Sequence, residues 1–304
     1  MSEYQRYEFV ALDRPLSARQ MTALRAISTR AEISATRFWN EYNWGDLAAD
    51  PAKLLARYFD AHLHFTSWGT HRLMLRLPKA RVNVKDLDPY FVARYGPRLA
   101  RAGEYVVLDI FTDAEDGESA YNHKTSRISL AELAPLHAEL IRGDLRPAYL
   151  AWLIAVGGHE VDDDAMEPPV PAGLSELTAA QQAMIEFLRI DVDLVGAAAE
   201  TSGTASKEDA SFRRWLATLS AKKKHEWLKR AANEPQLALG AELRRAFQVT
   251  VKRATTVARR TAGELRTLAK ARRAAAQRSR TARTNKAKAA SGSQRRTKSG
   301  SRRG

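Results

Sequence analysis

The first eighty residues alternate between strand-like and helix-like spacing of apolar side chains. Tyr7, Phe9 and Ala11 occupy every second position, which indicates a half-buried strand. Ser17, followed by Gln20 three residues later, forms a capping box and predicts a helix start. A second strand is expected within residues 31–39.

Another helix and two more strands complete this N-terminal pattern. Asp50 and Pro51 are typical of an N-cap and of the first helical position. The leucines at positions 73, 75 and 77 indicate a half-buried strand. Residues 105–111 are almost continuously apolar, which favours a central strand covered on both faces. We therefore expect an α+β domain of ferredoxin-like type over residues 1–127.

From Ser129 onward the apolar spacing is helical. Ser129 and Glu132 form a second capping box, and Pro135 should kink or shorten the helix that follows. The pattern predicts an all-helical domain over residues 128–250. Residues 159–173 are acidic and rich in proline, which is typical of a linker within it.

Apolar residues become scarce after Val251, and from Ala269 to the end none is larger than alanine. Such a segment buries too little apolar surface to offset the entropy of ordering it. We expect the fold to end near Val251 and residues 251–304 to be a disordered, low-complexity tail.

Charge divides close to this boundary, at residue 244. Residues 244–304 hold 20 Lys and Arg and one acid, Glu264, whereas the rest of the chain holds 29 Lys and Arg against 34 Asp and Glu. A basic tail on a mildly acidic body is suited to nucleic acid or another polyanion.

Composition and motifs exclude several function classes. The chain has no cysteine, which excludes disulfides and thiolate metal sites. Its N-terminus lacks the apolar core of a signal peptide, and its most apolar stretch, Ala148–Val156, is far shorter than the ~20 residues of a membrane span. We expect a cytoplasmic protein without a membrane partner. Phosphate-loop, dinucleotide, nucleophile-elbow and kinase motifs are absent, so the sequence predicts no cofactor and disfavours an enzyme.

Several N-terminal segments resemble a family of uncharacterised bacterial proteins. They are Leu12–Ser17, Leu24–Arg30, Asn40–Asp46 and Trp68–Pro78. The resemblance is strong over about the first eighty residues and loose over the helical half. It implies a bacterial, cytoplasmic protein and transfers no activity, cofactor or site residue.

The tail is the leading candidate for a binding site. Lys and Arg neutralise phosphates and release condensed counterions, and the small residues between them include no aromatic side chain for stacking on bases. We therefore expect contact with DNA or RNA without sequence choice. The candidate residues are Lys252, Arg253, Arg259, Arg260, Arg272, Arg273, Arg278, Arg280, Arg295 and Arg296.

Metal binding has weaker candidates. His62 and His64 would share one face if their segment were a strand, and Asp60 and His71 would add ligands. Because the segment ends a helical pattern, ordinary packing is favoured. The acidic runs 159–163 and 113–118 lack the ligand spacing of zinc-protease and calcium sites.

Aromatic residues near arginines give two further hypotheses. Trp39, Tyr42, Trp44 and Trp68 lie close in sequence to arginines at 37, 72 and 76, as in sheets that contact RNA. Polar residues among these tryptophans could also line a small-molecule pocket.

Three functions follow in order. The first is a non-enzymatic binding or adaptor protein whose tail binds nucleic acid. The second is a protein–protein interaction module with a solubilising tail. The third is an enzyme with a pocket near Trp39–Trp44.

Overall fold

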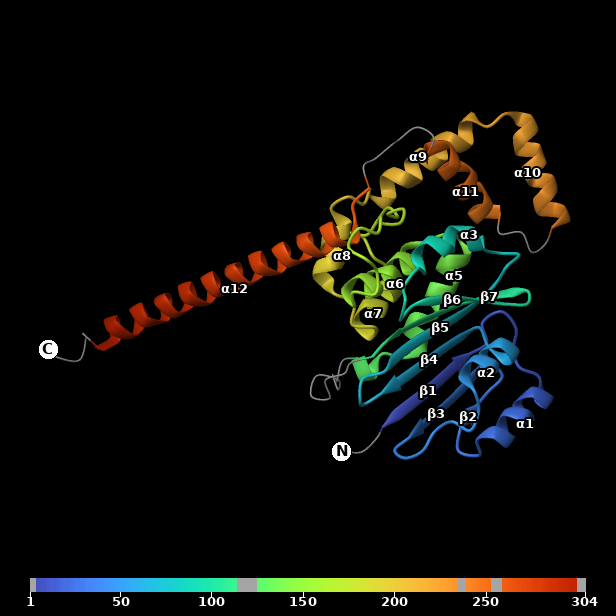
Figure 1. Ribbon diagram of the computed structural model, residues 1–304, viewed down its shortest axis with the longest axis horizontal. Helices are drawn as coiled ribbons and strands as arrows, with labels where there is room; N and C mark the ends of the chain where they lie inside the picture. Colours follow the sequence, from blue (N-terminus) through green and yellow to red (C-terminus); the bar gives the residue numbers. More distant parts are fainter. Residues whose placement is uncertain (1–3, 114–124, 235–238, 253–258, 300–304) are drawn as a thin grey trace.

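The computed structural model describes residues 4–113, 125–234, 239–252 and 259–299. Its N-terminal part is a mixed α/β unit built on one sheet (Figure 1). The strands are β1 (Gln5–Val10), β2 (Glu32–Ile33), β3 (Arg37–Tyr42), β4 (Ala61–Thr66), β5 (His71–Pro78), β6 (Arg98–Ala102) and β7 (Tyr105–Thr112). The helices in this part are α1 (Ala18–Ile27), α2 (Pro51–Tyr58) and the single turn α3 (Val84–Leu87).

The sheet has seven strands in the order β2-β3-β1-β4-β5-β7-β6, and all its pairings are antiparallel. A ferredoxin-like arrangement is not confirmed, because the second half of the sheet is a meander in which β5 pairs with both β4 and β7. The segment around His62 is strand β4, where we had expected the end of a helix. Its residues Ala61–Thr66 pair along their length with β1.

The two faces of the sheet bury different cores. On one face, Phe9 and Phe38 pack with Leu24 of α1 and Leu55 of α2. The opposite face, which includes Leu73, is covered by five helices. These are α4 (Leu130–Leu133), α5 (Pro135–Ile141), α6 (Arg146–Gly157), α7 (Ala179–Phe187) and α8 (Val192–Ala199).

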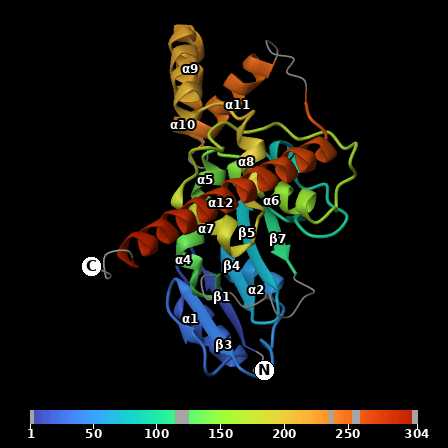
Figure 2. The same cartoon turned by 90° about the vertical axis from the view of Figure 1, so that its left-hand side faces the viewer.

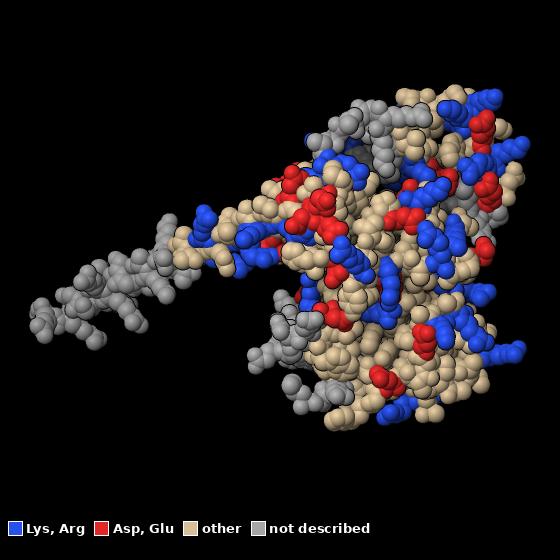
Figure 3. Space-filling view, in the orientation of Figure 1, with Lys and Arg blue, Asp and Glu red and all other residues tan. Residues whose placement is uncertain are grey.

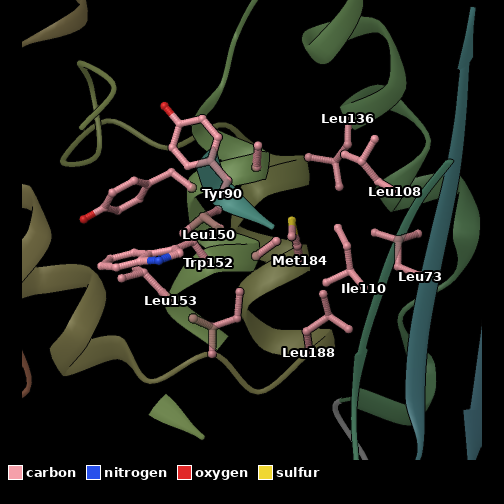
Figure 4. Packing of buried hydrophobic residues seen from close by; sticks show 14 of the residues in the cluster. Leu73, Tyr90, Leu108, Ile110, Leu136, Leu150, Trp152, Leu153, Met184 and Leu188 are labelled. Carbon is pink, nitrogen blue, oxygen red and sulfur yellow. The ribbon is translucent and has the colours of Figure 1, made fainter. Parts of the chain in front are cut away.

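Sheet and helical half share this second core. Figure 4 shows Leu73, Leu108 and Ile110 of the strands facing Leu136, Met184 and Leu188 of the helical half. The expected boundary at residues 127 and 128 therefore separates no independent core. Pro135 begins α5 directly after α4 ends, which confirms the predicted interruption at that proline.

The proline-rich segment 159–173 is part of the fold. Val161 and Glu167 are buried, and the Tyr90 hydroxyl donates to the carbonyl of Pro169 at 2.7 Å. The expectation of a linker is correct only in that no helix or named strand forms there.

Three helices then stand apart from this core in Figure 1: α9 (Ala205–Thr218), α10 (Ala221–Asn233) and α11 (Leu239–Lys252). The last helix, α12 (Ala262–Ser299), starts against α8 and α6 and projects away from the body (Figures 1 and 2).

Candidate nucleic-acid interface

The N-terminal turns of α12 belong to the folded core. Ala262 and Leu265 are fully buried and Ala269 almost so, in the cluster that also contains residues of α6 and α8. Thr261 and Glu264 form a capping box: the Thr261 amide donates to Glu264 Oε2 at 2.8 Å, and the Glu264 amide to Thr261 Oγ1 at 3.2 Å. The prediction that folding ends near Val251 is therefore wrong.

A buried carboxylate fixes the chain just before α12. Glu167 accepts hydrogen bonds from Arg260 Nε at 2.9 Å and Nη2 at 2.8 Å, and from the Tyr149 hydroxyl. Its backbone amide donates to the carbonyl of Arg260, and its carbonyl accepts from Arg259. Burial, together with the charge of Glu167, raises the pKa of Tyr149 above its ordinary range, so its hydroxyl stays a donor.

Acidic residues of the body hold the next turns of the helix. Arg272 pairs with Glu200 at 2.5 Å, and Arg273 pairs with Asp191 and with Asp193, the latter at 3.1 Å. Gly196 of α8 makes room for the Arg272 guanidinium, since a Cβ there would lie 2.7 Å from it. The charges at positions 272 and 273 therefore neutralise the body rather than face solvent alone.

The structure divides the ten candidate binding residues into groups. Arg259, Arg260, Arg272 and Arg273 bond within the fold. Arg278 and Arg280 are exposed on α12. Arg295 and Arg296 lie on the same helix and Lys252 at the end of α11, with side chains beyond those described. Arg253 lies outside the described residues.

Past its anchored turns, α12 carries one sign of charge. Residues 277–304 include ten Lys and Arg and no acid. The helical part, 277–299, would extend about 35 Å at 1.5 Å per residue. Figure 3 shows acidic side chains gathered where the helix leaves the body and basic side chains along its described length. Two parts of α12 therefore differ. The first turns, residues 262–273, which we call the root, have arginines paired with acidic residues of the body. The outer part, residues 277–299, has only basic charged residues in its sequence.

The histidines singled out in the sequence do not form a metal site. His62 and His64 share a face of β4, but the His62 ring stacks on Phe9, and His64 stacks on Tyr7 and bonds Gln5 Oε1 at 3.0 Å. His71 faces the opposite core, where its Nδ1 bonds the carbonyl of Phe187.

A different group of potential ligands lies at the start of β4. Asp13, Asp60 and His137 offer ligand atoms that all lie within 4.8 Å of one another. Asp60 already accepts from two backbone amides and from Arg76, and Asp13 pairs with Arg81 at 3.2 Å. With two arginines among the two aspartates, the group is better described as an ion-pair network than as a cation site.

The arginines proposed for an RNA-contacting sheet are also paired. Arg72 makes a bidentate contact with Asp109 at 2.7 Å, and Arg76 pairs with Asp60 at 2.6 Å. At the proposed small-molecule pocket, Trp44 is 71% exposed, and the neighbouring Asn40 is buried and already donates to Ser28 Oγ.

Comparison with known proteins gives no match to a family model, to a curated protein or to a solved structure. Over the part of the chain that the structure describes, no helix combines the length and apolar character needed to cross a bilayer. The most coherent candidate site is therefore the anchored basic helix.

Proposed function

We propose that this protein binds nucleic acid without sequence specificity through the outer part of α12, and that the α/β body carries that helix as a binding or adaptor unit. The observation that supports this most is the division of α12 into a root with paired arginines and an outer part, residues 277–299, whose sequence has eight cations and no acid.

Anchoring matters for affinity. A tail joined to the body by a loose linker loses much conformational freedom on binding, whereas a helix fixed at its root presents charges that are partly ordered beforehand. Phosphate contacts supply affinity and position but read no sequence. Because residues 277–304 contain no aromatic side chain, stacking on single-stranded bases is disfavoured, and duplex backbone is the expected partner.

The first test is a truncation that keeps the root. Deleting residues 277–304 removes ten cations and spares Leu265 and Arg273. If about eight of these cations contact phosphates, the log–log salt slope of duplex binding should flatten by about 7, and affinity at low salt should fall at least 100-fold. Fluorescence anisotropy with two unrelated duplexes of equal length, titrated at several salt concentrations, measures both quantities.

A matched pair of double variants tests whether the effect belongs to the outer part of α12. Arg278→Ala with Arg280→Ala should weaken binding about tenfold and flatten the slope by about 2. Arg14→Ala with Arg19→Ala removes the same charge from exposed positions near the N-terminus and leaves the ion pairs that anchor α12 intact, so it should change affinity by less than about threefold. Equal losses in both pairs, or a truncated chain that binds as tightly as the full one, would refute the assignment. No binding by the full chain even at low salt would favour a protein–protein interaction module with a solubilising tail.

A further inference from the structure

A second basic region lies outside α12, in the three helices α9, α10 and α11. Residues 205–252, which we call the three-helix module, contain 11 Lys and Arg against five Asp and Glu. The remaining part of the body, residues 1–204, is net acidic, with 21 Lys and Arg against 29 Asp and Glu. This local excess does not show in a count over residues 1–243 as a whole.

Internal ion pairs use most of the acids of the module. Asp209 pairs with Arg244 at 2.9 Å, which joins α9 to α11. Arg230 of α10 pairs with Glu234 at 3.3 Å and Glu242 at 3.9 Å. In these ion pairs the basic partners are arginines, and the lysines of α10 take no part in them.

The lysines of α10 face solvent. No residue of α10 is buried, and Lys222, Lys223 and Lys229 are exposed. Within the described part of the chain, none of these three has a carboxylate within 4 Å. Lys222 and Lys229 share a helix face with His225, since the three positions are spaced by three and four residues.

Helix α9 adds a second exposed row. Arg213 and Arg214 are exposed and line a shallow groove together with Asp209, Ala210 and Ala217. The Asp209 carboxylate is paired with Arg244, so the two guanidinium groups are the groove's cations for a phosphate backbone.

The helices of the three-helix module pack against one another, and α11 contacts the rest of the body. The rings of Phe212, Trp215 and Phe247 pack together at centroid distances of 5.6–5.9 Å. Arg245 of α11 pairs with Asp86 of α3 at 3.1 Å, and Ala241 of α11 lies so near Gly143 that a Cβ added at that glycine would be 3.5 Å from it. Figures 1 and 2 show the module and the projecting end of α12 in different directions from the body.

We infer that the exposed face of α10, with the arginines of α9, is a second phosphate-binding surface, so that a long duplex contacts the protein at two separate places. The inference rests on the proposed function of α12 and extends it from one contact to two. An anionic membrane is a weaker candidate, because Leu228, at 65% exposed, is the only large apolar side chain of α10 that lies mostly in solvent.

Two contacts on one duplex predict a dependence on length. Once α12 is bound, the second contact becomes intramolecular and gains from a high effective concentration, provided that the duplex can reach both. A duplex of about 10 bp should engage one surface, whereas one of about 40 bp, roughly 136 Å long at 3.4 Å per base pair, can span both.

The test compares charge reversal on α10 with the same reversal elsewhere. Lys222→Glu, Lys223→Glu and Lys229→Glu should lower affinity for a 40-bp duplex at least tenfold more than for a 10-bp duplex. The control triple variant, Arg14→Glu, Arg19→Glu and Lys53→Glu, makes the same change in net charge on the acidic part of the body and should lower both affinities by similar, smaller factors. Replacing the three α10 lysines by alanine should give an intermediate effect and guards against misfolding.

The outcomes separate the two proposals. Full-chain binding that the α10 variant weakens no more than the control would overturn the second surface and leave the first intact. Absence of any duplex binding by the full chain would overturn both. If the α10 variant loses binding to vesicles containing anionic lipid but keeps its affinity for the 40-bp duplex, the surface belongs to a membrane and the inference is wrong.

Discussion

At the scale of single residues, Glu167 does most to fix the start of α12. It is 2% exposed. Its carboxylate accepts hydrogen bonds from Arg260 and Tyr149, and its backbone amide donates to the carbonyl of Arg260. A sequence pattern does not reveal such a residue, because its partners lie 18 and 93 positions away.

Replacing Glu167 by Gln should leave the Arg260 charge buried without its counterion. We expect the free energy of unfolding to fall by about 3 kcal/mol, since removing one partner of a buried pair leaves a desolvated charge. Urea unfolding of the full chain measures the change. As a control, Glu200→Gln removes an exposed partner of Arg272 and should cost less than about 1 kcal/mol. Similar losses in the two variants would contradict the role given to Glu167.

His71 is one residue through which acid should act on the core. Burial, opposed by the hydrogen bond to Phe187, lowers the pKa of His71 to about 4. An unfolded histidine titrates near 6.5, so the unfolded chain takes up this proton first as the pH falls. The stability that neutral His71 supports is complete above about pH 6.5 and is lost progressively toward pH 4.

The expected loss from His71 between pH 7 and pH 4.5 is roughly 2 kcal/mol. His71→Phe keeps a ring against Phe65 and Phe187 and removes the titrating group. Its urea midpoint should therefore fall less over that pH range than the midpoint of the unmodified chain. An unaltered pH dependence in His71→Phe would show that other groups govern acid unfolding.

At the scale of elements, α12 is buried at its N-terminal end and exposed to solvent further along. Leu265 is fully buried and Leu268, one turn further on, is 36% exposed. The root buries only a few small or medium apolar residues, so its stability depends on the capping box and the ion pairs around them.

Two leucines of α12 test whether the root belongs to the fold. Leu265→Ala should lower the free energy of unfolding by about 3 kcal/mol, because it opens a cavity in the core. Leu268→Ala should lower it by less than about 1 kcal/mol, since that side chain is partly in water. Thermal unfolding of the two variants beside the unmodified chain measures the difference. Equal, small effects would mean that the segment is a dispensable tail.

At the scale of the whole molecule, positive charge is concentrated away from the sheet. Residues 1–204 have more acids than bases, and some of these acids hold α12 at its root. An acidic body should repel nucleic acid, so contact would be limited to α12 and the three-helix module. Both proposals therefore predict that affinity for nucleic acid depends on where a charge is removed, and not only on the net charge of the protein.

Local sequence signals determined several elements correctly. Ser17 caps α1 with Gln20, and Asp50 caps α2 through the amides of Ala52 and Lys53, because capping needs only neighbours along the chain. Residues 105–111 lie within β7, which is paired on both edges and buried on both faces, as their continuous apolar character predicted, although it is one strand from the edge of the sheet. The local pattern failed at β4, where pairing with β1 and β5 outweighs the helical spacing.

Only the tertiary structure decided which charged side chains already have an ion-pair partner within the fold. The sequence shows that the excess of basic residues begins after residue 243, but it gives no means of telling the arginines of that segment apart. The fold brings Glu167, Asp191, Asp193 and Glu200 to α12 and the residues just before it from 72 or more positions away, and thereby separates anchoring arginines from exposed ones. Composition fixes how many charges a chain carries, but only packing fixes which of them meet a partner, because ion pairs form between residues that are close in space and distant in sequence.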